Sequence, residues 1–376
     1  MTKVCHVTCV HGKEDVRIFL KECCSLAQAG YDVWLVQQGE SYDKRGVHVA
    51  GFGAIAPNRL RRMLQTAKQA YKKALEVDAD LYHLHDPELL PYALKLKRRG
   101  KKVIFDSHER YTEQLKEKPY LPSWCLGLVA GAYGWYERYV LSKIDAVIFP
   151  CTMGGINPFE KVCSRSAIIS NAAILDELFM QIDTAAEKCR NQICYIGGLT
   201  YARGITYLIQ AAHKADARLS LAGAFSPKEY EQELRAMEAF SSVDFRGLLD
   251  RTEVAKLLKQ SVAGICTLLN EGQYYKIDTF GIKVFEYLSV GLPVILSDSP
   301  YNKAMVSQYQ FGICVDPTDV EQISQAIRYL LDHPEQARQM GENGRKAVEQ
   351  VFNWNTEEKK LFALYEDIVK TEENGK

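Results

Sequence analysis

The stretch "DTFGIKVFEYLSVGLPVILSD" (residues 278–298) places three charged side chains, Asp278, Lys283 and Glu286, in a run that is otherwise mostly apolar. The spacing of the apolar residues predicts a helix over 280–290 that leads directly into a buried strand. A helix followed by an apolar strand is the repeating unit of α/β proteins, so this stretch indicates an open parallel sheet.

The charged residues at the start of this helix have two explanations. Asp278 and Thr279 stand where a side chain can cap the helix, and Lys283 and Glu286, three residues apart, could form a surface ion pair. Alternatively, the helix N-terminus beside Gly281 is a phosphate site, with Lys283 adding charge and Glu286 accepting hydrogen bonds from sugar hydroxyls. The spacing alone favours neither explanation.

Outward from this stretch, apolar strand-like runs alternate with helical patterns along most of the chain. This rhythm is typical of parallel sheets covered by helices, and its interruption near residues 176–190 predicts two doubly wound units in tandem. From 319 to about 365 the pattern is nearly all helical. The predicted strands are 3–10, 31–37, 80–84, 102–106, 145–149 and 166–170, then 192–198, 217–223, 243–247, 262–268, 293–298 and 312–316.

Composition supports a soluble protein of two domains. The chain has 376 residues and a net charge of zero, but residues 1–175 hold 25 basic against 18 acidic side chains, so this half is the better partner for an anion. The eleven cysteines include no C-x-x-C pair, which favours reduced thiols over disulfides or a zinc site. No apolar run reaches the ~20 residues of a membrane-spanning helix, and no signal peptide is evident, so we expect a cytoplasmic location.

In open α/β sheets ligands bind beyond the carboxyl ends of the strands. Polar residues and glycines that directly follow predicted strands are therefore candidate ligand contacts. Besides the 278–286 stretch they are Gly12, His85, Asp86, His108, Glu109, Gly197 and Gly198.

Five segments in order resemble glycosyltransferase family 4, especially its bacterial surface-polysaccharide branch. They are "EDVRIFLKECCSLAQAGYDVWLV" (14–36), "YHLHDPELLPYALKLKRRGKKVIFDSHE" (82–109), "YIGGLTYARGI" (195–205), the 278–298 stretch and "FGICVDPTDVEQISQAIRYLLDHPEQARQMGENGRKAV" (311–348). The resemblance implies the α/β GT-B fold, in which two Rossmann-like domains face each other across a cleft. We expect an acceptor domain over 1–172, a nucleotide-sugar domain over 190–350, and a last helix within 351–376 that crosses back to the first domain.

The resemblance also implies how the 278–298 stretch binds the donor. Glu286 matches the family's glutamate on the ribose hydroxyls, and the backbone amides of Thr279, Phe280 and Gly281 would reach the sugar and phosphates. Asp278 stands where the family usually has a glutamate on the transferred sugar, and it is one methylene shorter.

The glycine turn "GGLTYARG" (197–204) would be the second donor element. Family members commonly carry an arginine after the first glycine and a lysine near the end of the loop. This chain has Gly198 at the first place and Arg203 at the second. Arg203 can bind the diphosphate bidentately, and Lys283 could replace the missing arginine.

The N-terminal half would supply the sugar and acceptor contacts. His108 matches the family's histidine beside the transferred sugar, and with Arg203 and Lys283 it is a predicted catalytic residue. His85 and Asp86 are predicted acceptor contacts, as is Glu109, although Asp86 with its neighbouring proline could simply cap a helix.

The loop after the first predicted strand supplies two further candidates. Gly12 stands where relatives often carry a glycine pair and is assigned to the donor. Arg17 could reach a phosphate or pair with Asp15 or Glu14.

We expect no metal and no cofactor apart from the substrate, a nucleotide-diphosphate sugar, with a UDP-sugar as the first choice. The "DAD" at 78–80 could suggest a metal-binding D-x-D, but it precedes a strand rather than following one. It is therefore interpreted as a turn.

Two features concern the acceptor. Residues 58–75 carry six Lys and Arg without an acidic residue, and residues 94–102 carry six more, while 121–139 is strongly apolar. A solvated basic face is one explanation, and a peripheral contact with the inner face of the membrane, where lipid-linked sugars are found, is the other. No nucleic-acid-binding module accompanies the charge.

The resemblance implies a retaining glycosyltransferase that moves a sugar onto a glycan or lipid-linked acceptor in polysaccharide biosynthesis. Two alternatives remain. One is another GT-B enzyme, such as a nucleotide-sugar epimerase or an inverting transferase. The other is a non-catalytic nucleotide-sugar-binding or scaffold relative, which the departures at Asp278 and Gly198 would fit.

Overall fold

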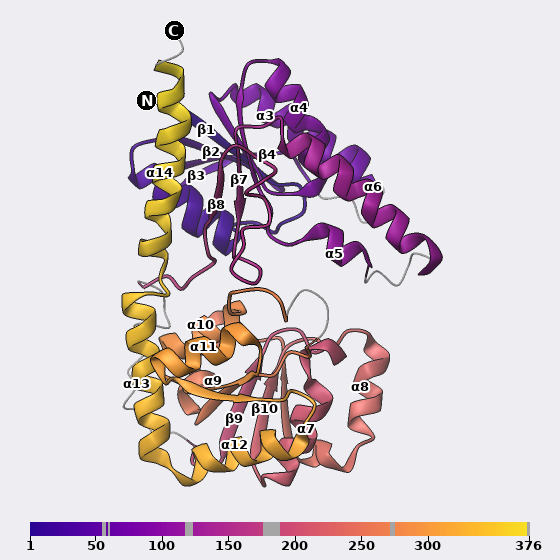
Figure 1. The fold of residues 1–376 in the computed structure, drawn as a ribbon, viewed down its shortest axis with the longest axis vertical. Coiled ribbons are helices and arrows are strands. Elements are labelled where there is room, and N and C mark those ends of the chain that lie inside the picture. Colours follow the sequence, from indigo (N-terminus) through magenta and orange to yellow (C-terminus); the bar gives the residue numbers. More distant parts are fainter. Residues whose placement is uncertain (55–57, 59–60, 117–122, 176–188, 271–274, 374–376) are drawn as a thin grey trace. The chain divides into compact units, whose positions relative to one another are not determined.

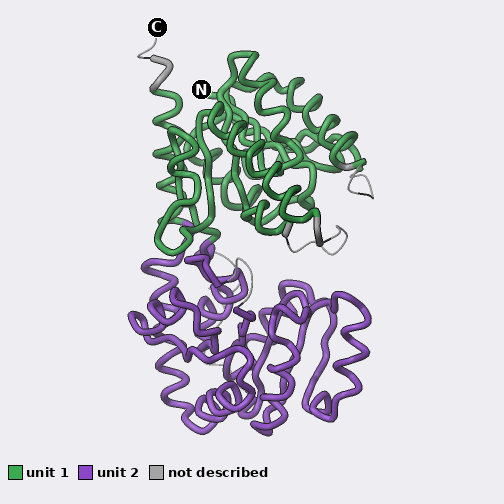
Figure 2. Tube along the Cα trace, turned by 45° about the vertical axis from the view of Figure 1, so that its right-hand side comes forward, with its two compact units in different colours: residues 1–171, 355–376 green, residues 172–354 purple. Residues whose placement is uncertain are grey.

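The computed structural model describes residues 1–54, 58, 61–116, 123–175, 189–270 and 275–373. The chain forms two compact units (Figure 2): unit 1 comprises Met1–Asn171 and Asn355–Lys376, and unit 2 comprises Ala172–Trp354. Most of the polar stretch expected near 176–190 lies outside the described residues.

Unit 1 is built on an eight-stranded sheet in the order β3-β4-β2-β1-β5-β6-β7-β8. All of its strand pairs are parallel except β3 with β4. Strands β1, β5, β6 and β7 are buried along almost their whole length, as expected for a sheet covered on both faces. The strands are β1 (Lys3–Val7), β2 (Asp32–Gln37), β3 (Tyr42–Lys44), β4 (Val47–Gly51), β5 (Leu81–Leu84), β6 (Lys102–Asp106), β7 (Ala146–Phe149) and β8 (Ser166–Ile168).

Helices cover both faces of this sheet (Figure 1). Figure 1 shows α3, α4 and α6 over one face, while the last helix, α14, runs along the other. The helical elements are η1 (Val16–Cys23), α1 (Cys24–Gln28), η2 (Arg62–Thr66), α3 (Ala67–Val77), η3 (Pro87–Leu89), α4 (Leu90–Arg98), α5 (Tyr111–Lys116), α6 (Ser123–Leu141) and α14 (Trp354–Glu373). The chain therefore returns to unit 1 after completing unit 2, as the GT-B resemblance implied.

Unit 2 contains a six-stranded parallel sheet in the order β11-β10-β9-β12-β13-β14. Renumbered within the unit, this is the 3-2-1-4-5-6 order of the Rossmann fold. The strands are β9 (Gln192–Ile196), β10 (Arg218–Ala222), β11 (Val243–Gly247), β12 (Ala263–Cys266), β13 (Val294–Ser297) and β14 (Gly312–Val315).

Two hydrophobic layers stabilise unit 2, one on each face of its sheet. Apolar side chains of α7, α8 and α12 form one layer, and those of α9, α10 and α13 form the other. The helical elements are η4 (Tyr201–Arg203), α7 (Ile205–Lys214), α8 (Lys228–Arg235), η5 (Glu238–Ser242), α9 (Arg251–Gln260), α10 (Ile282–Ser289), α11 (Pro300–Tyr309), α12 (Val320–Asp332) and α13 (Pro334–Gln350).

The β3–β4 hairpin was not predicted. The edge strand β3 is three residues long and partly exposed, and the next strand, β4, is interrupted by the exposed His48, so neither shows the apolar run that marks the inner strands. The interpretation of "DAD" as a turn agrees with the structure: Asp78 ends α3 in the left-handed conformation, and Asp80 accepts from the backbone N–H of Lys3.

Candidate functional site

In unit 2 a tight turn follows β9 at the carboxyl edge of the sheet. Gly197 has φ +115°, a conformation that side-chain-bearing residues rarely adopt, and a Cβ there would lie 3.1 Å from the Lys283 Nζ atom. A Cβ at Gly198 would lie 3.6 Å from the Nε atom of Arg203. The two glycines thus let two cations approach one short piece of backbone, as an anion-binding turn requires.

Lys283 is the most unusual residue of this turn. Its ammonium has no hydrogen-bond partner among the described residues, although the side chain is only 8% exposed. The ammonium lies 3.7 Å from the centre of the Tyr195 ring, within range of a cation–π interaction. The pKa of Lys283 is lowered to about 8, chiefly by burial. The nearby Arg203 contributes to this lowering, while Cys266 and Glu286 act in the opposite direction. A bound anion would relieve this desolvation.

The glycine turn leads into η4, whose last residue is Arg203. Gly204 follows in the left-handed conformation, and its missing side chain leaves room for the carbonyl oxygen of Thr267. The Tyr195 hydroxyl donates to the Gly198 carbonyl at 2.9 Å, so the turn that carries Arg203 is fixed to β9. The structure brings together Gly197, Gly198, Arg203 and Lys283, four of the residues predicted from sequence.

The loop before α10 does not cap this helix with a side chain. The N-cap is Gly281, so the prediction that Asp278 or Thr279 might cap the helix is wrong. Phe280 is only 5% exposed, and its ring packs against Phe285 and other aromatic rings of the core. Only its backbone is placed to contact a ligand, while the buried ring holds the loop against unit 2.

Glu286 lies one turn after Lys283 in α10 and is 18% exposed. The ion pair recorded for it joins its Oε1 atom to the Nη1 atom of Arg251, 3.5 Å away, rather than to Lys283 as the surface-pair explanation assumed. Arg251 begins α9 directly after Asp250, which caps that helix in a capping box with Glu253. Sequence analysis missed Arg251, although the cap motif "DRTE" marks its position at a helix start.

In unit 1 Asp86 fixes the loop that follows β1. Its Oδ2 atom accepts from the Thr8 hydroxyl at 2.9 Å and from the backbone N–H groups of Cys9 and Val10. It makes no side-chain cap to η3, so the helix-cap explanation is wrong, and at 2% exposure it is not open to an acceptor. Gly12 lies in this loop, is exposed, and has open space where a Cβ would stand.

Arg17 occupies a buried ion pair instead of reaching a phosphate. Its guanidinium donates from Nε and Nη2 to the two carboxylate oxygens of Asp106, at 2.8 and 3.0 Å. Its Nε atom also lies 3.2 Å from the Oε1 atom of Glu22, and the side chain is 4% exposed. The predicted alternatives, a phosphate or a pair with Asp15 or Glu14, are wrong because the π-helical turn of η1 directs Arg17 into the unit.

His108 is the partly exposed end of a chain of polar groups. Its Nε2 atom lies 3.2 Å from both the Asp106 carboxylate and the Nδ1 atom of His85. Although burial acts in the opposite direction, Arg17 and His108 hold the pKa of Asp106 well below its ordinary value. His85 is 2% exposed, so it supports His108 from inside rather than contacting an acceptor. Glu109 is exposed, and its carbonyl accepts from the Ser107 hydroxyl.

Two family models match the chain. Residues 17–153 match the model described as Glycosyltransferase Family 4, and residues 179–347 match Glycosyl transferases group 1. Two α/β units, with a glycine turn and paired cations at the carboxyl edge of the second sheet, are the arrangement of a GT-B nucleotide-sugar protein. The chain belongs to glycosyltransferase family 4.

Curated relatives are similar over parts of the chain. The D-rhamnosyltransferase WbpZ of Pseudomonas aeruginosa is 27% identical over 42% of this chain and 40% of its own length. The MMP alpha-(1->4)-mannosyltransferase of Mycolicibacterium hassiacum is also 27% identical, over 48% and 44%. A GDP-mannose:cellobiosyl-diphosphopolyprenol alpha-mannosyltransferase of Xanthomonas campestris is 23% identical over 67% and 64%. The chain thus spans less than half the length of the first two relatives.

Solved structures share the fold over nearly the whole chain. The sucrose-phosphate synthase of Thermosynechococcus elongatus superimposes with a TM-score of 0.75 at 17% identity, over 99% of this chain and 100% of that one. The Anabaena protein HepE, in complex with UDP and glucose, gives 0.68 at 13% identity over 98% and 100%. These similarities establish the GT-B fold.

Proposed function

We propose that the protein is a retaining glycosyltransferase that moves a sugar from a nucleotide-diphosphate sugar to a glycan or lipid-linked sugar in polysaccharide biosynthesis. The observation that carries this proposal is the ammonium of Lys283, buried beside the Gly197 turn with no hydrogen-bond partner among the residues that the structure describes. A buried cation is unfavourable unless something pairs with it, and a diphosphate would do so.

In this proposal the diphosphate binds between Arg203 and Lys283 and accepts from the amide group of Gly198, while the Gly197 amide donates to the Ala222 carbonyl and fixes the turn. The N-terminus of α10, which no side chain caps, supplies further N–H donors at Gly281 and the residues after it. Every one of these diphosphate contacts comes from unit 2.

The nucleoside and the sugar are assigned to neighbouring residues of the same unit. Glu286 accepts from the ribose hydroxyls, with Arg251 orienting its carboxylate. Asp278, Thr279 and the backbone at Phe280 hold the transferred sugar. We propose a UDP-sugar as the donor, supported by the complexes of HepE with UDP and UDP-glucose. GDP-mannose, which appears in the name of the Xanthomonas relative, is the competing donor.

The transfer step needs negative charge on the leaving diphosphate to be stabilised. Arg203 and Lys283 are placed to do this as preorganised cations, so the proposal needs no metal at the donor and no cofactor. In front-face displacement the leaving oxygen takes the proton of the acceptor hydroxyl, so a protein carboxylate base is not needed. His108 positions the transferred sugar, held by the buried Asp106 and His85.

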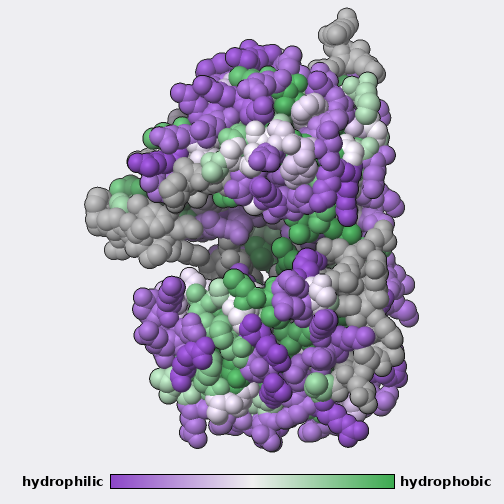
Figure 3. All heavy atoms as spheres, turned by 180° about the vertical axis from the view of Figure 1, so that it is seen from behind, coloured by the Kyte–Doolittle hydropathy of each residue, from purple (hydrophilic) through white to green (hydrophobic). Residues whose placement is uncertain are grey.

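The acceptor side is assigned to unit 1, where α6 carries an exposed apolar face. Leu128 and Trp135 are each 72% exposed, and the Trp135 ring stacks on Tyr139. Green atoms lie beside the grey residues at the left edge of Figure 3, over the first part of α6. No described helix is long and apolar enough to cross a membrane. We propose that α6 and the basic residues of α3 and α4 contact the cytoplasmic face of the membrane peripherally, near a lipid-linked acceptor.

The first test is a donor panel. Purified protein is mixed with UDP-, GDP- and other nucleotide sugars, and both the melting temperature and nucleoside diphosphate release are followed, with EDTA in half of the samples. One donor should raise the melting temperature and be hydrolysed or transferred without a metal requirement. The matched variant Lys283→Met should lose both responses, while Lys214→Met, an exposed lysine of the same unit, should keep them.

The product tests the stereochemistry. With the donor identified, NMR of the product should show the anomeric configuration of the donor retained. An inverted product would point to the other transferase class, and conversion of the donor without an acceptor would point to an epimerase. No response to any donor would contradict the proposal and favour the non-catalytic alternative.

A further inference from the structure

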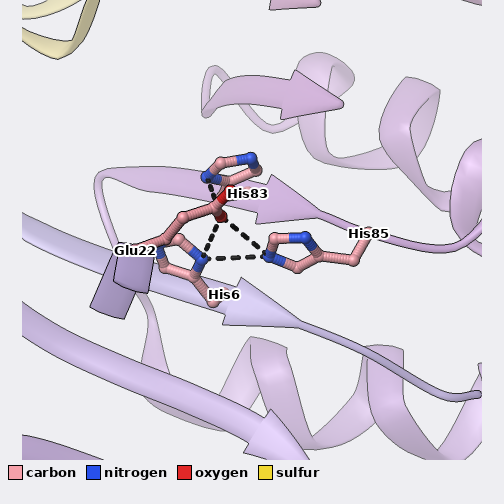
Figure 4. Close-up of side chains that lie close together, drawn as sticks. All are labelled: His6, Glu22, His83 and His85. Atoms are coloured by element: carbon pink, nitrogen blue, oxygen red, sulfur yellow. Dashed lines mark hydrogen bonds and ion pairs between the residues drawn. The ribbon is translucent and has the colours of Figure 1, made fainter. Parts of the chain in front are cut away.

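Four fully buried polar side chains meet beneath η1 in unit 1. His6 lies on β1, and His83 and His85 come from β5 and the residue after it. Because His6 is paired with His83 across two parallel strands, and His85 is two residues further on, all three rings project from the same face of the sheet. Figure 4 shows these rings arranged around the carboxylate of Glu22, which comes from η1.

The distances between these groups suit a single small ion. The Oε2 atom of Glu22 lies 3.8 Å from His6 Nδ1, 3.9 Å from His85 Nε2 and 4.0 Å from His83 Nδ1. His6 Nδ1 and His85 Nε2 are 3.0 Å apart, and one donor atom from each of the four residues lies within 4.8 Å of the others. Ligands at about 2.1 Å from one tetrahedral ion are roughly 3.4 Å apart, so a small contraction around Glu22 completes the site.

Hydrogen bonds within unit 1 do not satisfy all of the polar atoms in this cluster. Neither carboxylate oxygen of Glu22 has a hydrogen-bond partner among the described residues, and neither has the Nε2 atom of His83. Arg17 pairs with Glu22 at 3.2 Å, but the same guanidinium also pairs with Asp106. Two buried carboxyl groups therefore share one guanidinium, which leaves Glu22 room for a further cationic partner.

The outer partners of two rings fix which nitrogen faces inward. His85 Nδ1 lies 3.5 Å from the Asp106 carboxylate, and His6 Nε2 lies 3.2 Å from the Tyr365 hydroxyl of α14, which is also 2.8 Å from His83 Nδ1. His6 Nδ1 and His85 Nε2 therefore face the centre of the cluster, 3.0 Å apart. A carboxylate or hydroxyl on the far side of an imidazole is the usual second layer of a metal site.

One further observation agrees with ligation. The segment that carries Glu22, Val16–Cys23, is π-helical, and such turns are frequent at functional sites.

We propose that His6, Glu22, His83 and His85 bind one zinc-like divalent transition-metal ion inside unit 1. Three imidazoles and one carboxylate suit Zn²⁺ and its first-row neighbours better than Mg²⁺ or Ca²⁺. The ion would join β1, β5 and η1, and through Tyr365 it would also hold α14. This inference departs from the sequence-based expectation of no metal, which weighed the cysteine spacing and the "DAD" motif but not this cluster. It concerns unit 1, whereas the diphosphate is assigned to unit 2.

The test is the metal content of the full chain, purified without a polyhistidine tag from medium supplemented with zinc. Elemental analysis should find one zinc ion per chain after dialysis. The same preparation from cobalt medium should show the visible absorption bands of a tetrahedral site. Wild-type protein without bound zinc, and without those bands, would overturn the proposal. Zinc that dialyses away from wild-type protein would be adventitious and would overturn it as well.

Matched variants locate the ion. Glu22→Gln and His85→Gln should lose the zinc, while His213→Gln, which changes a histidine in unit 2, should retain it. Equal zinc content in Glu22→Gln and wild type, with circular dichroism showing both folded, would place the ion elsewhere and refute this site.

Discussion

Unit 1 and unit 2 each bury a cation close to the carboxyl edge of a parallel sheet. The cation of unit 1 is paired with carboxylates, and the cation of unit 2 is not. Arg17 in unit 1 donates to both oxygens of Asp106 and also contacts Glu22. Among the described residues of unit 2, the ammonium of Lys283 has no hydrogen-bond partner and lies over the face of the Tyr195 ring. The sequence suggested both residues as phosphate contacts. Of the two, Lys283 is the one whose charge remains available to bind a phosphate.

The difference separates a structural charge from a functional one. A buried cation with its own carboxylates stabilises the fold when both partners are present, and removal of one partner is what destabilises it. A buried cation without a carboxylate destabilises the free protein and gains its partner from the ligand. The predictions below test this contrast, beginning with the largest expected effect.

Arg17→Met should destabilise unit 1 by about 3–5 kcal/mol, because it leaves the buried carboxylates of Asp106 and Glu22 without their cation. Chemical denaturation followed by circular dichroism measures the change. Arg338→Met is the control, since this exposed arginine pairs with Glu335 and Glu342 on the surface and should change the stability by less than about 1 kcal/mol. Equal effects of the two substitutions would show that the Arg17 pair is not structural.

Lys283→Met should lower turnover by roughly 100- to 1,000-fold, the usual loss when one preorganised charge partner of a transition state is removed. Steady-state kinetics with the identified donor measure this loss. The free variant should nevertheless be more stable than the wild type at pH 7, by about 1–3 kcal/mol, because the desolvated ammonium is gone. A variant that is both inactive and less stable would assign Lys283 to the fold instead.

The pH dependence of the same lysine follows from its lowered pKa. The pKa of Lys283 is about 8 in the folded protein, against an ordinary value of 10.5. The buried ammonium therefore lowers the free energy of unfolding by its full amount below pH 8, and this loss of stability disappears as the pH rises towards 10.5. The stability gap between Lys283→Met and wild type should therefore narrow between pH 8 and 10.5. Donor affinity should fall by up to about tenfold per pH unit above 8, as calorimetry can measure. A constant gap would contradict the lowered pKa.

Arg251→Gln should have the smallest effect. Its pair with Glu286 is 3.5 Å long and Arg251 is 49% exposed, so the fold should lose less than about 1 kcal/mol. We expect a few-fold weaker binding of nucleoside diphosphate in calorimetry, whereas Glu286→Gln should weaken binding more. If Arg251→Gln weakened binding more than Glu286→Gln, Arg251 itself would contact the nucleotide.

Short-range sequence patterns were enough to predict the two parallel sheets and much of the donor site. The apolar runs of the inner strands and the positions of glycines and charges directly after them indicated both sheets and the turn with Gly197, Arg203 and Lys283. The resemblance added the family, the GT-B fold and the return of the last helix. Each of these signals lies within a short stretch of sequence, where spacing decides which residues share a face.

Contacts between distant segments could not be predicted. Arg17 pairs with Asp106, 89 positions away, and sequence analysis considered only its neighbours. His83 was not singled out, and its hydroxyl partner Tyr365 lies 282 positions further on. The β3–β4 hairpin was missed because edge strands need no apolar run. These contacts depend on which helices and strands pack together, and the spacing of residues within a short segment does not determine that packing.

The return of α14 to unit 1 has a consequence for how the protein is made. Unit 2 is an insertion in unit 1, so the ribosome releases the whole of unit 2 before it releases Tyr365. During that interval the rings of His6 and His83 lack the hydroxyl that links them in the finished protein. The last helix therefore closes unit 1 late in synthesis: until Tyr365 has left the ribosome, the two rings have no hydroxyl between them.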